Sequence, residues 1–477
     1  MTVDLSDLLS NHPSVVPVSA DDVVEARHRA HDHTVYVVLD DDPTGTQSVA
    51  DLPVLTAWEV DDFRWAFDTG KPAVYVMTNS RSLAPADAER VNREVVAAAL
   101  QAAGDTPVAF VSRSDSTLRG HFPLEPLTIA EEIRTATGHG VDGIVVVPAF
   151  GDAGRITVDG VHYAGSRDAG FTPVGETEFA RDATFGYRSS RLADWVEEKT
   201  QGGTKADDVL HLDLTTLRTD RARTVEILRS ATGAAVIVVD IVEEEDLRQL
   251  SLALIDAEAA GSRFVYRVGP PFTRARIGQA VHPPVTLDEI RSSRSERELA
   301  TGGLVVVGSH VDLTTRQLAH LREAAHPVEL EIEVAQVIDA ALRDAHVRDI
   351  AARAAEALND GTVVVRTSRA LVTGADGDES LHISRQVSAA VVEVVQRVLA
   401  ANPPRFVVAK GGITSSDVAT KGLGFRHANV ISPMLPGIVS LWSGQDGPAA
   451  GIPYVVFAGN VGAADSLAAV VDTLTQA

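Results

Sequence analysis

The chain has 477 residues, and its 45% hydrophobic and 23% charged content predicts a folded protein of two or three domains. It contains no cysteine, which excludes disulfides, thiolate metal sites, iron–sulfur clusters and a cysteine nucleophile. The net charge of −24 without a basic run argues against a nucleic-acid partner. No apolar stretch approaches the length of a membrane span, and the N-terminus has no signal-peptide pattern, so we expect a cytoplasmic protein.

The first 33 residues form a polar, His- and Asp-rich extension, with one expected helix near Asp21–Ala30. From Thr34 onward, apolar runs alternate with helical patterns, which predicts βαβ units on a mostly parallel sheet. The Asp159-Gly160 pair between two valines predicts a tight hairpin. The expected strands of this region cover residues 35–39, 73–78, 108–112, 144–148, 235–240 and 263–268, and two expected helices cover residues 85–103 and 124–137.

Four prolines, at positions 270, 271, 283 and 284, and the charged run 291–298 break this alternation. A second series of expected strands then covers residues 304–308, 362–366, 405–409 and 454–458. The predicted fold class is α/β, with two α/β domains that have mostly parallel sheets and a cleft between them. The predicted divisions are an N-terminal extension (1–33), a first domain (34–270), a linker (271–300) and a second domain (301–477).

Three consecutive carboxylates, Asp40, Asp41 and Asp42, follow the first expected strand, and Pro43 and Gly45 then turn the chain. Ligands of open α/β sheets bind beyond the carboxyl ends of the strands. Adjacent carboxylates repel one another, so this turn favours a functional role over the alternative of a solvated acidic turn.

A second polar loop follows residues 108–112 and contains the cations and hydroxyls that a small hydroxy acid would need. Its candidate residues are Arg113, Ser114, Asp115, Ser116 and Arg119. Arg81 follows another expected strand and could join the same cluster. Beyond residues 144–148, Asp152 and Arg155 either contact a ligand or pair with each other, and the sequence favours neither interpretation.

In the second domain, three expected strands end in loops of small residues, which suits the binding of a phosphate chain by backbone N–H groups. These loops contain Gly308-Ser309, Gly411-Gly412 with Thr414 after it, and Gly459-Asn460, while Lys410 and Lys421 add positive charge. A GxGxxG match at Gly138–Gly143 precedes a strand instead of following one, so we reject it as a dinucleotide fingerprint.

Together these motifs resemble the four-carbon acid sugar kinase family, from about Val35 to the C-terminus. The resemblance is carried by the acidic turn Asp40–Gly45, the Asp-Ser-Thr-Leu-Arg-Gly run at Asp115–Gly120, and the loops Gly308–Ser309, Gly411–Thr414 and Gly459–Gly462. It implies phosphate transfer from ATP to the terminal hydroxyl of an acid such as threonate, erythronate or a 3-oxo-tetronate. Three positions depart from the family pattern: Pro43, Arg113 and Ile413.

The resemblance implies an N-terminal domain that binds the sugar acid and a C-terminal domain that binds ATP, with Mg²⁺ on its phosphates. A homodimer is also kept open. The implied catalytic candidates are Asp41, Asp42 and Asp115; the substrate-binding candidates are Asp41, Arg81, Arg113, Ser114, Asp115, Ser116 and Arg119; the nucleotide-binding candidates are Ser309, Gly411, Gly412, Ile413, Thr414, Gly459 and Asn460. The alternatives are a sugar-acid aldolase, epimerase or dehydratase, or a ligand-binding regulatory protein.

Overall fold

The structure is a computed structural model that describes residues 2–294, 297–369, 377–435 and 437–477. The chain divides into two compact units, Met1–Val281 and His282–Ala477. Each unit is an α/β structure built on its own run of neighbouring strands, as expected for the fold class.

The first unit is built on a parallel sheet with the strand order β2-β3-β1-β4-β11-β5-β10-β9. β1 lies between β3 and β4, and most residues of these strands are buried, because helices cover both faces of the sheet. The strands are β1 (Val35–Asp40), β2 (Leu52–Leu55), β3 (Ala73–Met77), β4 (Val108–Arg113), β5 (Gly143–Val147), β9 (Leu210–Leu212), β10 (Ala235–Val239) and β11 (Phe264–Val268).

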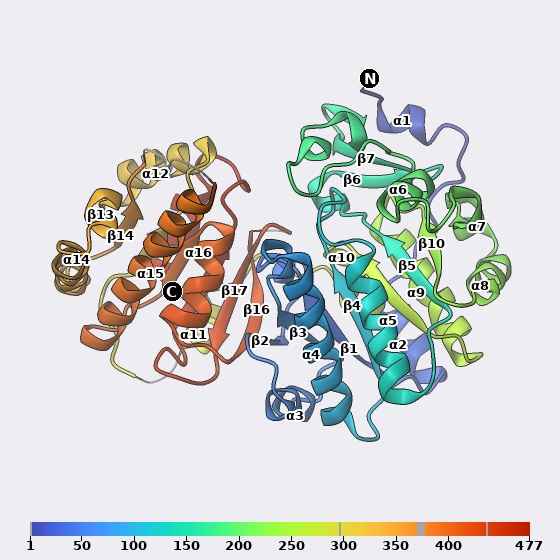
Figure 1. Ribbon diagram of the computed structural model, residues 1–477, viewed down its shortest axis with the longest axis horizontal. Helices are drawn as coiled ribbons and strands as arrows, with labels where there is room; N and C mark the ends of the chain where they lie inside the picture. The colour runs from blue at the N-terminus through green and yellow to red at the C-terminus, as the bar shows by residue number, and fades with distance from the viewer. Residues whose placement is uncertain (1, 295–296, 370–376, 436) are drawn as a thin grey trace. The chain divides into compact units, whose positions relative to one another are not determined.

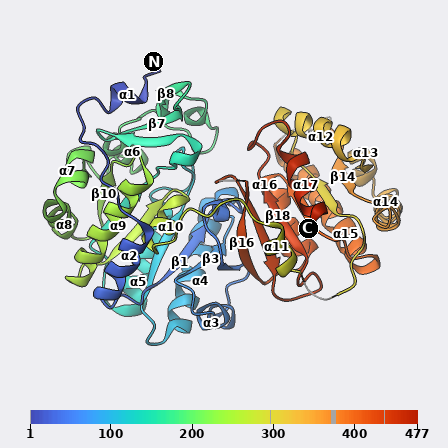
Figure 2. The same cartoon turned by 180° about the vertical axis from the view of Figure 1, so that it is seen from behind.

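Helices α4 and α5 cover one face of this sheet, which is turned to the viewer in Figure 1. Helices α2, α9 and α10 cover the opposite face, which is seen in Figure 2. The helices of the first unit are α1 (Leu5–Leu8), α2 (Ala20–Arg29), α3 (Val60–Asp68), α4 (Pro85–Ala103), α5 (Leu124–Thr137), α6 (Leu192–Lys199), α7 (Leu214–Thr219), α8 (Arg221–Ser230), α9 (Glu244–Ala259) and α10 (Pro271–Arg276).

A small antiparallel sheet, β6-β7-β8, is inserted between β5 and β9 of the first unit. Its strands are β6 (Arg155–Val158), β7 (Val161–Ser166) and β8 (Gly170–Pro173). Asp159 and Gly160 both have positive φ, 51° and 73°, as a two-residue hairpin turn between β6 and β7 requires. The predicted hairpin is therefore confirmed.

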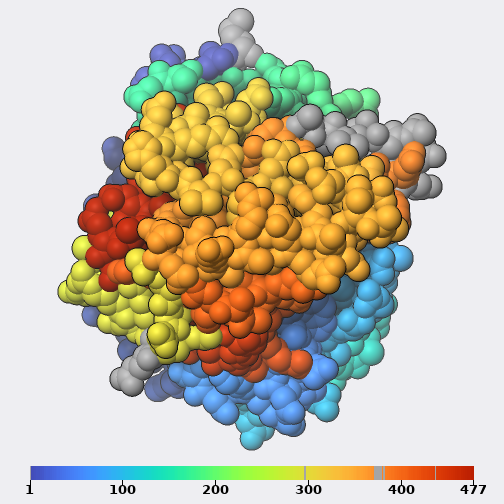
Figure 3. Space-filling model, turned by 90° about the vertical axis from the view of Figure 1, so that its left-hand side faces the viewer, coloured from blue at the N-terminus to red at the C-terminus, as the bar shows by residue number. Residues whose placement is uncertain are grey.

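The second unit has a mixed sheet with the strand order β13-β14-β12-β15-β18-β17-β16. Its first five strands pair in parallel, and β17 pairs antiparallel with both β18 and β16. Its strands are β12 (Leu304–Val307), β13 (Val328–Ile332), β14 (Val363–Thr367), β15 (Val407–Lys410), β16 (His427–Leu435), β17 (Val439–Gly444) and β18 (Pro453–Phe457). Its helices are α11 (Leu287–Ser292), α12 (Asp312–Ala325), α13 (Val334–Ile338), α14 (Arg343–Ala357), α15 (Gly377–Ala401), α16 (Gly412–Asp417) and α17 (Ser466–Gln476). α12 and α14 appear in yellow to orange on the face shown in Figure 3.

Residues 271–300, which we expected to form a linker, are partly helical. Pro271–Arg276 form α10, whose six residues are all buried within the first unit. Along the chain, the boundary between the two units falls between Val281 and His282. Pro271 stands at a position where a helix tolerates proline, so the proline pair that suggested a break instead begins a helix. Within the described residues, we find no helix with the length and apolar character that a membrane span needs.

A buried ion pair ties the N-terminal extension to the first unit. Arg218 on α7 donates from Nε and Nη2 to the carboxylate of Asp246 on α9, at 2.7 and 2.9 Å, and both side chains are almost fully buried. The third nitrogen of Arg218 donates to the carbonyl of Pro13 at 2.7 Å. Asp246 also accepts from the backbone N–H groups of Val242 and Glu243. All three side-chain nitrogens of Arg218 and both carboxylate oxygens of Asp246 therefore make hydrogen bonds.

We predict that Arg218→Met lowers the free energy of unfolding by about 3–5 kcal/mol, because it leaves a buried carboxylate without its cation. Urea unfolding followed by tryptophan fluorescence measures this change, since Trp58, Trp65 and Trp195 all lie in the first unit. Arg221→Met is the matched control, because the Arg221–Asp256 pair is about half exposed, and its loss should cost less than about 1 kcal/mol. Equal effects of the two substitutions would contradict the prediction.

Candidate active site

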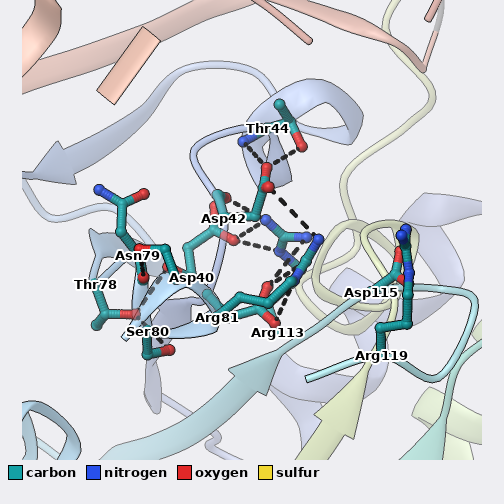
Figure 4. A network of polar contacts seen from close by, with 12 residues as sticks. Asp40, Asp42, Thr44, Thr78, Asn79, Ser80, Arg81, Arg113, Asp115 and Arg119 are labelled. Atoms are coloured by element: carbon teal, nitrogen blue, oxygen red, sulfur yellow. Dashed lines mark hydrogen bonds and ion pairs between the residues drawn. The ribbon is translucent and has the colours of Figure 1, made fainter. Parts of the chain in front are cut away.

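The register of the first sheet brings the predicted polar residues to one edge. Asp40, at the end of β1, lies opposite Met77 of β3 and Arg113 of β4. Asp41 and Asp42 therefore emerge next to Arg81, which follows β3 in a short 3₁₀ turn. Figure 4 shows Asp40, Asp42, Arg81 and Arg113 gathered in one network of polar contacts.

Asp40 is paired with Arg113, and both side chains are only 3% exposed. Burial raises the pKa of Asp40 to about 7, and the Arg113 cation opposes that rise. Gly45 packs directly against this pair: a Cβ at Gly45 would lie 2.1 Å from an Asp40 carboxylate oxygen and 2.3 Å from Arg113 Nε. The acidic turn thus needs glycine here for close approach, and Asp40 with Arg113 forms the buried base of the site.

Arg81 forms a bidentate ion pair with the next carboxylate, Asp41. Its Nη2 and Nε donate to the two carboxylate oxygens of Asp41, at 2.6 and 3.1 Å, and Asp41 is buried. Burial raises the pKa of Asp41, although Arg81 and Arg113 both oppose this.

Asp42 is the most accessible of the three carboxylates, with 25% of its side chain exposed. One oxygen accepts from the backbone N–H of Thr44 at 2.9 Å, while the other lies 3.5 Å from Arg81 Nη1. Burial opposes ionisation of Asp42, but the Arg81 and Arg113 cations outweigh it and lower its pKa. Asp42 is therefore an ionised carboxylate with one lightly engaged oxygen.

Asp115 belongs to the loop after β4 and accepts from Arg119 Nε at 2.7 Å and from the Thr117 hydroxyl. Burial opposes its ionisation, but Arg81 and Arg119 hold its pKa well below the usual range. Ser114 and Ser116 lie in the same loop and are buried. Among the substrate-binding candidates, the structure brings Arg81 and Arg113 into contact with Asp41, and it pairs Arg119 with Asp115.

A buried network behind this loop was missed by the sequence analysis. Arg267 on β11 donates to the Ser112 hydroxyl at 2.8 Å and to Glu125 on α5, which in turn accepts from the Ser80 hydroxyl. His162 on β7 is fully buried, and its Nε2 lies 2.8 Å from the Ser116 carbonyl. The strand-end position of Arg267 was a usable signal, whereas Glu125 lies in the first turn of α5, where an acidic residue is common, and gave none.

Asp152 and Arg155 do not pair with each other, which settles one choice that the sequence left open. Asp152 lies 3.4 Å from Arg274 on α10. Arg155 has no ion pair among the described residues, and its buried Nε has no hydrogen-bond partner.

In the second unit, the three glycine loops predicted for the nucleotide pack against one another. A Cβ at Gly459 would lie 2.4 Å from Ser309 Oγ, and a Cβ at Gly308 would lie 2.2 Å from Thr414 Oγ1. Gly411 has φ of 131°, and its Cβ would lie 3.0 Å from that same threonine oxygen. The ends of strands β12, β15 and β18 therefore meet in a tightly packed glycine cradle, in which a side chain at position 308 or 459 would clash with Thr414 or Ser309.

Two basic side chains support this cradle. Lys410 is fully buried, and its Nζ donates to the Ala458 carbonyl at 2.6 Å, so it ties the Gly411 loop to the Gly459 loop. Burial lowers the pKa of Lys410 to about 7. Arg369, which follows β14 and was missed in the sequence, donates to the Ser309 carbonyl and to the Thr315 hydroxyl.

A cavity of about 260 Å³ adjoins these loops. Its lining combines Gly308 and Thr414 with apolar side chains of α15 and with Ile413, which is 69% exposed. Asn460 is also exposed, and Gly412 begins α16. Asp417, one turn beyond Ile413, accepts from Ser388 and from Lys421, so Lys421 is engaged by a carboxylate.

No group of three or more His, Asp or Glu side chains in the described part of the chain is arranged to hold a metal ion. The carboxylates of Asp40, Asp41 and Asp115 each pair with an arginine.

Comparisons with known proteins agree with this division of roles. The profile of a sugar-binding N-terminal domain matches residues 36–276, and that of a nucleotide-binding C-terminal domain matches residues 304–467. A D-erythronate kinase from Heliobacterium modesticaldum is 26% identical over 69% of this chain and 70% of its own. A D-threonate kinase from Bordetella bronchiseptica is 28% identical over 82% of this chain and 84% of its own.

Solved structures show the same fold. A Salmonella typhimurium protein, 18% identical, covers 91% of this chain and 98% of its own with a TM-score of 0.65. A Haemophilus influenzae protein, 17% identical, covers the same shares with a TM-score of 0.62. The two domain profiles span most of the sequence in the expected order. The chain belongs to the four-carbon acid sugar kinase family.

Proposed function

We propose that this protein is an ATP-dependent kinase that phosphorylates the terminal hydroxyl of a four-carbon sugar acid of the threonate, erythronate or 3-oxo-tetronate type. The observation that carries the proposal is the set of strand-end carboxylates of the first unit, each matched by an arginine. Phosphoryl transfer needs mainly positioning and charge neutralisation, which such a preorganised set supplies.

The glycine cradle of the second unit supports a nucleotide site, because it brings together three strand-end loops of small residues, which suit the binding of a phosphate chain. Backbone N–H groups of Ser309, Gly412 and Gly459 would hold the phosphates, since the Gly411 N–H already donates to the Phe457 carbonyl at 2.8 Å. The cavity beside Ile413 would take the base. ATP supplies the phosphoryl group, and Mg²⁺ carried on its phosphates neutralises charge on the transferred group. Lys410 acts as a positioning residue that keeps two of the loops together.

Asp42 is the residue we assign to the attacking hydroxyl. It is ionised, it is the most accessible of the three consecutive carboxylates, and one of its oxygens is only lightly engaged by Arg81. It can therefore accept the hydroxyl proton or orient that hydroxyl. Asp41, with both oxygens bound to Arg81, holds that arginine in place, and Asp115 is left to receive another hydroxyl of the acid.

A sugar-acid aldolase, epimerase or dehydratase would use the same acidic loop but would leave the glycine cradle without a role. Incubating the full chain with ATP, Mg²⁺ and each four-carbon sugar acid in turn, and measuring ADP release, tests the proposal. ADP release that depends on one or a few of these acids supports a kinase. Conversion of an acid without ATP, or no ADP release with any of them, would overturn it.

We predict that Asp42→Asn lowers kcat by about 10²–10⁴-fold, since it removes the acceptor for the hydroxyl proton, and leaves ATP affinity unchanged. Steady-state kinetics with the active sugar acid and calorimetric ATP titration measure the two quantities. Asp61→Asn is the control, because Asp61 is 86% exposed and pairs with Arg64 on its own helix. A variant at Asp42 with wild-type kcat would exclude this assignment.

We predict that Gly459→Ala weakens ATP binding by about tenfold or more, because the added Cβ would force the Ser309 side chain away and distort the cradle. Calorimetric titration of ATP into the full chain measures the change, with the melting temperature as a check on folding. Gly140→Ala is the matched control, since its Cβ would meet no atom within 4 Å. Unchanged ATP affinity in the Gly459 variant would place the nucleotide elsewhere.

A further inference from the structure

Almost every arginine near the strand ends of the first unit already has a carboxylate partner. Arg81 holds Asp41, Arg113 holds Asp40, Arg119 holds Asp115 and Arg267 holds Glu125. A guanidinium whose donors are taken by carboxylates of the protein is poorly placed to bind a further anion. To bind the carboxylate of a sugar acid, the site therefore needs an arginine or lysine that is not already paired with a carboxylate of the protein.

Arg155 is that cation among the described residues. It is half-buried, it makes no ion pair, and its Nε is fully shielded from solvent without a hydrogen-bond partner. Burial lowers its pKa, and Asp115 and Arg119 are the charges close enough to act on it. A buried donor without an acceptor is costly, so an anion bound here would gain from satisfying it.

A second arginine lies at the same place. The guanidinium carbons of Arg119 and Arg155 lie 5.4 and 5.5 Å from the ring centre of Phe179. Both distances are within the range of cation–π attraction, which holds each cation against the ring. Of the two, only Arg119 has carboxylate partners, Asp115 at 2.7 Å and Asp182 at 3.8 Å.

The backbone that presents Arg155 is held firmly. Phe150 and Arg155 exchange backbone hydrogen bonds of 2.8 and 3.0 Å, which close the turn before β6. Gly154, just before Arg155, has φ of 72°, and a Cβ there would lie 1.8 Å from the Gly165 carbonyl oxygen. This turn requires glycine on both counts, and it fixes where the Arg155 side chain starts.

From these contacts we infer that Arg155 binds the carboxylate of the sugar acid, with Arg119 beside it and Asp115 accepting a hydroxyl from the adjoining carbon. The inference rests on the proposed function and deepens it, because it names the group that selects acids over neutral sugars. It also orients the substrate: the carboxylate end lies at the β6 turn, and the terminal hydroxyl points toward Asp42. Arg81 and Arg113, which the sequence analysis assigned to the carboxylate, then organise the aspartates.

The test compares the sugar acid that the wild-type protein uses with its uncharged amide. We expect the wild type to prefer the acid, by about 10- to 100-fold in kcat/KM, and Arg155→Gln to lose this preference. The loss should come from a higher KM for the acid, while the KM for ATP and activity toward the amide stay nearly unchanged. Arg155→Lys should be intermediate, because it keeps the charge and loses the two-pronged geometry.

Arg181→Gln is the matched control: it removes the same charge two residues from Phe179, at an exposed position, and should keep the preference. An Arg155→Gln variant that still prefers the acid would overturn the inference. If Arg155→Gln fails to fold, Arg155→Lys with wild-type discrimination would also overturn it. If the wild type transfers no phosphate, the proposed function fails, and calorimetric binding of the sugar acid without ATP then tests Arg155 by itself.

Discussion

The first unit depends on how three consecutive carboxylates are accommodated at the end of a buried strand. Asp40, Asp41 and Asp42 would repel one another, and burial adds to the free-energy cost of their charges. Arg113, from the neighbouring strand β4, and Arg81, from the turn after β3, meet these charges from either side of β1. The carboxylates therefore differ in exposure and in pKa. Asp40 is buried, and burial raises its pKa to about 7, while Asp42 is partly exposed and has a lowered pKa.

The Asp–Arg pairs at the strand ends also explain why glycine is needed beside them. Gly45 must lack a side chain, because Asp40 and Arg113 occupy the space that a Cβ would need. Gly120 is similar, since a Cβ there would lie 2.9 Å from Arg267 and 3.1 Å from Asp41. The second unit handles anions differently. It brings glycine backbones together and keeps Lys410 buried as a link between two loops, which suits a ligand that carries its own negative charge.

The sequence predicted the regular elements well where periodicity is strong. The helices expected at 85–103 and 124–137 have those bounds in the structure, and the buried valine-rich strands lie where expected. Two of the missed strands lack that signal: β2 is four residues long and contains Pro53, and β16 contains Pro433 and two register shifts. β13 (Val328–Ile332) was also missed, although its apolar and polar residues alternate. The rule that ligands meet at strand ends brought the aspartates together with Arg81 and Arg113. It could not tell which arginine remains unpaired, because that depends on which partners the folded chain brings within reach, as with Asp152 and Arg274.

We propose that the acidic strand end orients the terminal hydroxyl of the sugar acid for phosphorylation, while the carboxylate is held at the far end of the molecule. The most direct measurement is the NMR spectrum of the product formed from a ¹³C-labelled four-carbon sugar acid, ATP and Mg²⁺. The account predicts one phosphate, coupled to the carbon of the terminal hydroxyl, in amounts equal to the ADP formed. A phosphate on the carboxylate or on an inner hydroxyl, or an altered acid that carries no phosphate, would contradict it.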